Sequence, residues 1–143
     1  GSDLIYARDN ANITISGGEF KAGNISSDVG NQYVALNLKG GSDASISVTG
    51  GKFYKFNPAY NVSENPKKNF VAAGYSSVEE DDWYEVKVGI YNELALKAAL
   101  NKNFKSISLN SDIIISSPIL VTNKLVDIPA AHTNIIFFIS LII

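Results

Sequence analysis

The chain has 143 residues, enough for one ordinary domain or two small ones, and 45% of them are hydrophobic against 18% charged, a balance typical of folded chains. Its formal net charge of −2, with both signs interspersed, argues against an electrostatic nucleic-acid binder. The absence of cysteine excludes disulfide bonds and thiolate metal sites.

Two stretches in the N-terminal half repeat one pattern. Residues 13–20 read ITISGGEF, and residues 46–53 read ISVTGGKF, 33 positions later. In both copies apolar residues alternate with Ser or Thr, and a Gly-Gly pair precedes a Phe. Such alternation, bounded by Gly and Asn, predicts short strands, and a fixed period predicts a repeat architecture. We therefore expect the two copies to pair in parallel, with Phe20 stacked on Phe53.

The same repeat predicts a coil of strands joined by tight corners. Residues 35–41 (ALNLKGG) form another short apolar stretch that ends in a Gly pair, and the 33-residue period places Ile5 beside Leu38. The pairs Gly17-Gly18 and Gly50-Gly51 would be the stacked corners, where glycine allows a positive φ. An antiparallel meander with Gly-Gly hairpin turns remains an alternative at this point.

A helix is expected over residues 93–102 in the second half. Asn92 can cap it, and Glu93 and Lys102 have the signs that suit its two ends. Leu96, Ala99 and Leu100 would form its apolar stripe.

Alternating apolar residues follow this helix and predict further strands. They are Ile107, Leu109, Ile113 and Ile115, on either side of an Asn-Ser-Asp turn. The apolar run of nine after Asn134 is far shorter than the ~20 residues of a membrane-spanning helix.

The stretches ITISGGEF and ISVTGGKFYKFNPA resemble right-handed parallel β-helix repeats of the pectate-lyase-like superfamily. The closer likeness is to surface and phage-associated β-helix proteins of gut bacteria. Residues 69–89 resemble the segment that closes a coil stack, and residues 92–116 resemble the opening of a new one. The resemblance implies an all-β fold, a short solenoid of the right-handed parallel β-helix type, with one short helix near residues 93–102.

The resemblance also implies a division of the chain. Coils of period 33 would occupy residues 3–70, and closing strands or a cap would occupy residues 71–90. A helix and strands that open a second stack would cover residues 91–127. The apolar tail at residues 128–143 departs from the family pattern.

Enzymes of this superfamily use clustered Asp residues with Ca²⁺ and a basic residue, or paired Asp residues on one stacked face. In this chain Asp9 and Asp43 fall one position out of register, and the only Arg, Arg8, aligns with Gly41. The run EEDD at residues 79–82 lacks the spacing of a known Ca²⁺ loop and predicts a solvated turn. The only His, His132, lies in the tail. We therefore assign no catalytic residue, no metal ligand and no cofactor.

Three aromatic residues are the candidates for ligand binding: Tyr54, Tyr60 and Trp83. Aromatic side chains with a polar tip suit sugar rings and protein partners alike. The alternative, and the more ordinary role, is that these residues cover the open ends of the coil.

The resemblance implies a non-catalytic structural or adhesion module of a bacterial cell-surface or phage appendage protein, extracellular or on the virion, that contacts glycans. The alternative function is a fragment of a polysaccharide lyase or glycoside hydrolase. Self-association, or pairing with neighbouring coils of a longer chain, is expected because an end coil leaves backbone groups unpaired. We expect no nucleic acid as a partner and no membrane span.

Overall fold

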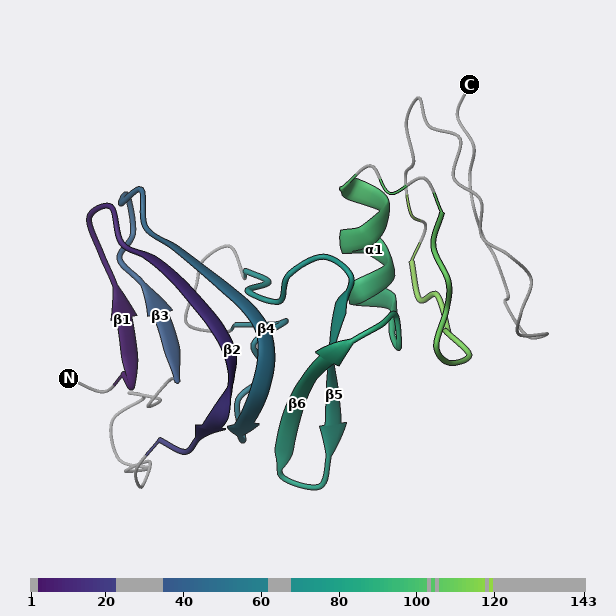
Figure 1. The fold of residues 1–143 in the computed structure, drawn as a ribbon, viewed down its shortest axis with the longest axis horizontal. Coiled ribbons are helices and arrows are strands. Elements are labelled where there is room, and N and C mark those ends of the chain that lie inside the picture. The colour runs from purple at the N-terminus through teal and green to yellow at the C-terminus, as the bar shows by residue number, and fades with distance from the viewer. Residues whose placement is uncertain are drawn as a thin grey trace. The chain divides into compact units, whose positions relative to one another are not determined.

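A computed structural model of the chain describes residues 3–22, 35–61, 68–102, 104, 106–117 and 119 (Figure 1). The chain divides into two compact units. The first comprises Gly1–Val71 and Ser77–Lys87, and the second comprises Ala72–Ser76 and Val88–Ile143.

Two sheets are formed within the described ranges. One is a parallel pair of the short strands β1 and β3, and the other has the order β2-β4-β6-β5 (Figure 1). The strands are β1 (Ile5–Ala7), β2 (Asn12–Phe20), β3 (Leu36–Leu38), β4 (Ser45–Tyr54), β5 (Tyr75–Glu80) and β6 (Trp83–Val88).

The predicted parallel pairing of the two repeat copies is confirmed. Strands β2 and β4 run parallel, with Ile13 opposite Ile46 and Phe20 opposite Phe53. The inward side chains of β4 are buried, and Phe53 is fully inaccessible to solvent. The antiparallel meander is therefore wrong for these two strands.

The predicted right-handed parallel β-helix is nevertheless wrong. Strand β6 pairs antiparallel with β4, with Gly51 opposite Val86 and Tyr54 opposite Trp83, where a coil would place another parallel strand. On the side of β4 that faces away from β2, the only parallel pairing among the described residues is a single bridge between Val48 and Val71. The backbone groups along the C-terminal half of β4 are thus used by a hairpin strand, and the result is a mixed sheet and not a solenoid.

The glycine pairs also differ from the prediction. Both lie inside the continuous strands β2 and β4 and do not form corners between strands. The β2–β4 register shifts between Ile15 and Ser16 and again between Ser16 and Glu19, as at a β-bulge. Gly18 and Gly51 do adopt the expected positive φ, +102° and +108°. The glycines therefore allow both strands to bend together.

Strands β1 and β3 pair in a register different from the one expected. Ile5 lies opposite Leu36, whereas the 33-residue period placed it beside Leu38. Residues 8–11 connect β1 to β2, and residues 39–44 connect β3 to β4, so the second connection is two residues longer. This difference in loop length accounts for the shift.

The predicted helix of the second unit is confirmed as α1 (Glu93–Asn101). The Asn92 side chain accepts a hydrogen bond from the Ala95 N–H at 3.0 Å, as an N-cap residue does. Lys102 follows as the C-cap. The buried face of α1 belongs to an apolar core made of Ile90, Ala95, Leu96, Ala99, Leu100, Ile107, Leu109, Ile113 and Ile119.

The strands predicted after this helix are wrong, although the predicted alternation of burial holds. Ile107, Leu109 and Ile113 are buried, yet the described residues of their segment form isolated bridges and no strand, and one of these bridges joins Leu109 to Ile90. The predictions for residues 120–143, including the apolar tail and His132, lie outside the described residues.

Candidate functional site

A row of charged side chains crosses three strands of the four-stranded sheet. Lys52 of β4 lies opposite Glu19 of β2 on one side and opposite Glu85 of β6 on the other. Because successive side chains of a strand point to opposite faces, this row lies on the face opposite to the buried Phe53. Opposite charges directly across strands attract one another, so Lys52 is placed between two carboxylates.

An aromatic pair lies beside this row on the same face. Tyr54 of β4 is directly opposite Trp83 of β6, and the two rings meet edge to face with their centroids 5.2 Å apart. The Tyr54 hydroxyl donates a hydrogen bond to Asp82 Oδ2 at 3.2 Å. The ammonium groups of Lys21 and Lys55 lie 4.5 Å and 5.3 Å from the centre of the Tyr54 ring. Contacts on several sides therefore fix the position of Tyr54.

The Lys55 ammonium also pairs with the turn that joins β5 to β6. Its Nζ lies 3.6 Å from Asp82 Oδ2. The negative charge of Asp82, followed by the interaction with Tyr54, raises the pKa of Lys55 above its ordinary value. The exposed pair contributes little to stability, but it links the end of β4 to the hairpin turn.

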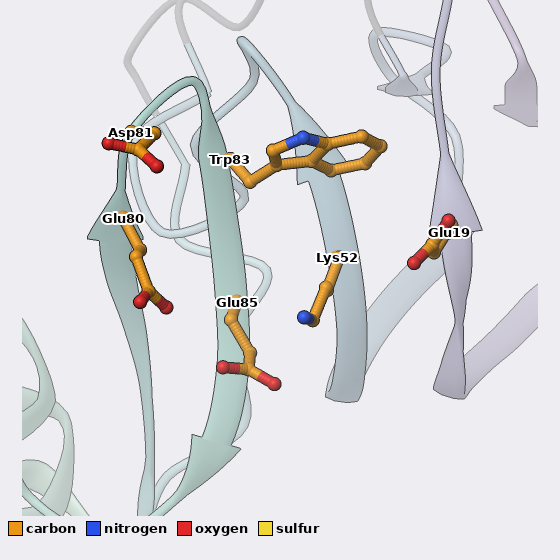
Figure 2. A pocket seen from close by; sticks show the side chains of 6 residues that line it. All are labelled: Glu19, Lys52, Glu80, Asp81, Trp83 and Glu85. Carbon is orange, nitrogen blue, oxygen red and sulfur yellow. The ribbon is translucent and has the colours of Figure 1, made fainter.

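The charged row and the indole surround a hollow that is open to solvent and has a volume of about 320 Å³. Figure 2 shows the Trp83 indole reaching from β6 across β4, with Lys52 below it and Glu19 on the far strand. The residues that line the hollow are Glu19, Lys52, Glu80, Asp81, Trp83 and Glu85. Four carboxylates and one ammonium thus share this lining with a single indole.

The structure brings together two of the three aromatic residues predicted to bind a ligand. Tyr54 and Trp83 are in contact, whereas Tyr60 lies on the turn after Asn57, has 47% of its surface exposed and does not line the hollow. Trp83 contacts Tyr54 because β6 pairs with β4. The same pairing covers the C-terminal half of β4, which would otherwise be an exposed strand edge.

The sequence interpretation did not identify Glu19, Lys52 and Glu85 as site residues. A signal existed for the first two, because the 33-residue period places Glu19 beside Lys52. No signal of this kind existed for Glu85, since its place opposite Lys52 depends on the antiparallel pairing of β4 with β6.

The residues of the acidic run at 79–82 have different roles. Asp81 and Asp82 form the exposed turn that the sequence predicted, and Asp81 has a positive φ of 54°, whereas Glu79 and Glu80, predicted as part of the same turn, are the last residues of β5. Glu80 and Asp81 line the hollow, whereas Glu79 accepts a hydrogen bond from Tyr84. Burial, followed by that hydrogen bond, raises the pKa of Tyr84.

The acids considered for catalysis lie elsewhere. Asp9 Oδ2 is 3.1 Å from Arg8 Nε, and both side chains are about two-thirds exposed. Asp43 is exposed and lies between β3 and β4. Among the described residues no group of three or more His, Cys, Asp or Glu side chains is arranged to hold a metal ion.

Within the ranges that the structure describes, no helix is long and apolar enough to cross a membrane, and α1 has nine residues. Comparison with known proteins found no match: no protein-family model, no curated protein and no solved structure is significantly similar to this chain.

Proposed function

We propose that the chain is a non-catalytic binding module that contacts a glycan through the face carrying the hollow. The observation that carries this proposal is the Trp83 indole, which stands against Tyr54 beside an open hollow lined with carboxylates. Aromatic rings with one apolar face and a polar tip stack on the C–H face of a sugar ring. Carboxylates accept hydrogen bonds from the hydroxyl groups at the edge of that ring.

The rigidity of the aromatic pair supports this role. Tyr54 is held by Asp82 and by two lysines, and it lies on a strand directly opposite Trp83. Side chains that are fixed before binding lose less conformational entropy when a ligand arrives. A weak, open site for a single sugar ring therefore gains affinity from its preorganisation.

A catalytic role has less support. The alternative of a polysaccharide lyase or glycoside hydrolase fragment depended on the coil of the β-helix superfamily, and the described strands form a mixed sheet. The acids considered for that chemistry, Asp9 and Asp43, do not line the hollow. An adhesion role on a bacterial cell surface or phage appendage stays part of the proposal and depends on the sequence resemblance alone.

A glycan array tests the proposal. We expect the intact chain to bind a subset of immobilised glycans, and Trp83→Ala to weaken this binding by about tenfold. Tyr6→Ala is the matched control, because Tyr6 is an aromatic residue on β1 with 49% of its surface exposed and lies outside the hollow. The proposal is wrong if the intact chain binds no glycan, or if both variants bind as the intact chain does.

A further inference from the structure

We propose that the hollow selects glycans with free amino groups, such as oligomers of glucosamine, over their N-acetylated forms. This inference rests on the proposed function, since it names the sugar chemistry that the same site would take. It is argued from the charge of the lining and from the position of the indole within it.

The lining has an excess of negative charge. Lys52 already lies directly between Glu19 and Glu85, so its positive charge is matched by its neighbours across the strands. Glu80 and Asp81 add two further carboxylates at the other side of the hollow. A hollow lined by charges of one sign raises the local concentration of ligands with the opposite sign. Neutral glycans gain nothing from this field, and acidic glycans are repelled by it.

The indole favours the same ligand. Trp83 lines the hollow together with the carboxylates, and Figure 2 shows it extending over the strand that carries Lys52. Tryptophan is the best aromatic partner for a cation placed over its ring. An aminated pyranose presents an ammonium group and an apolar ring face within one residue. It can therefore use the indole for stacking and the carboxylates for charge at the same time.

A basic peptide would satisfy only part of this arrangement. A lysine side chain carries an ammonium group on a flexible chain, which loses conformational entropy when it is held. It also lacks a rigid ring face that could cover the indole. The observations therefore favour the amino sugar, and binding of a basic peptide is treated as an outcome of the experiment.

The experiment compares a glucosamine hexamer with an N-acetylglucosamine hexamer by isothermal titration calorimetry on the intact chain. We expect the glucosamine hexamer to bind about tenfold more tightly at low salt. Raising the salt from about 0.1 M to about 1 M shortens the screening length from about 10 Å to about 3 Å and should remove most of this preference.

Two variants with the same change in charge locate the effect. Glu85→Gln removes a negative charge from the lining but keeps a hydrogen-bond acceptor, and it should weaken binding of the glucosamine hexamer by about fivefold and that of the acetylated hexamer by less. Asp43→Asn removes an exposed carboxylate outside the hollow, and it should change neither affinity. Circular dichroism checks that both variants fold.

The possible results separate this inference from the proposed function. Equal binding of the two hexamers, lost in Trp83→Ala, would overturn the amino-group selection and leave glycan binding in place. If neither hexamer nor any arrayed glycan binds, both proposals are wrong. An oligolysine that binds through Trp83 at least as tightly as the glucosamine hexamer would also overturn the inference, since it would identify a basic peptide as the partner.

Discussion

The rings of Phe20 and Phe53 stack with their centroids 4.8 Å apart and their planes inclined by 10°. The two residues occupy the same position in the two copies of the repeat and lie opposite each other on the parallel strands β2 and β4. Phe53 also contacts Phe56, with ring centroids 6.2 Å apart, and is fully buried. The stack fixes the register of β2 and β4. Tyr54, the residue after Phe53, points to the opposite face of the sheet, so the same register positions Tyr54 on the face that carries the hollow.

Replacing Phe53 with Ala should therefore lower the free energy of unfolding by about 3–5 kcal/mol, through lost burial and the cavity that remains. Urea denaturation followed by circular dichroism measures this change. As the control, replacing the exposed Tyr6 with Ala should change the free energy of unfolding by less than about 0.5 kcal/mol. Similar small losses in both variants would show that the stack does not hold the sheet.

Gly50 is required by the close approach of the neighbouring strand. A Cβ atom added to Gly50 would overlap the carbonyl oxygen of Ser16, which is backbone and cannot move aside freely. We expect Gly50→Ala to lower the free energy of unfolding by about 1–3 kcal/mol. Thermal melting measures the effect, with Gly17→Ala as the control.

The control is matched because Gly17 also lies inside a strand of the bulged pair. A Cβ atom at Gly17 would meet nothing within 4 Å. Since Ala loses less backbone entropy than Gly on folding, Gly17→Ala should be neutral or slightly stabilising. Equal destabilisation by both substitutions would mean that the close approach at Ser16 is not the cause.

Part of the fold could be predicted because the two copies of the repeat indicate which residues, distant in the sequence, lie side by side. Two copies of one pattern 33 residues apart predicted the parallel register of β2 and β4, and the helix was predicted from its cap and its apolar stripe. The repeat did not distinguish a β-helix from the observed mixed sheet, because the two copies pair in parallel in both. The resemblance implied closing strands or a cap at residues 71–90, but neither it nor the repeat indicates which neighbour Tyr75–Glu80 and Trp83–Val88 pair with.

Part of the candidate site could also be predicted from the sequence. Tyr54 and Trp83 were selected because amphipathic aromatic residues suit ligand binding, and the structure places them in contact. The place of Glu85 opposite Lys52 follows from the antiparallel pairing of β4 with β6 alone. A repeat identifies partners between its own copies and carries no information about a strand outside them.

Strand β2 is at the edge of the four-stranded sheet, and an exposed edge can pair with a second chain. We expect the intact chain to self-associate, as the sequence predicted, in a manner that depends on protein concentration. Thr14→Lys places a charge on this edge at an exposed position and should shift the chain toward the monomer. Light scattering measures this shift, with Ser108→Lys as a control at an exposed position away from β2. A monomer at every concentration would contradict the prediction.

Glu93 connects the first turn of α1 to the segment that follows the helix. Its Oε1 lies 2.7 Å from Lys97 Nζ, one helical turn along, and its Oε2 accepts a hydrogen bond from the Ser116 N–H at 3.1 Å. The side chain is 17% exposed. The hydrogen bond from Lys97, followed by that from the Ser116 hydroxyl, lowers the pKa of Glu93 from 4.5 to about 2.

This shift gives the stability of the second unit a defined dependence on pH. Because the folded-state pKa is below the unfolded value of 4.5, the contribution of the Glu93 carboxylate is fully present above pH 4.5 and is lost as the pH falls toward about 2. Glu93→Gln should therefore be less stable than the intact chain at neutral pH, by on the order of 1 kcal/mol given partial solvent screening, and the difference should disappear near pH 2. Thermal melting across this range measures the difference, with the exposed Asp112→Asn as the control. An NMR titration should place the midpoint of the Glu93 carboxylate near 2, and a midpoint near 4.5 would show that the contacts with Lys97 and Ser116 do not hold in solution.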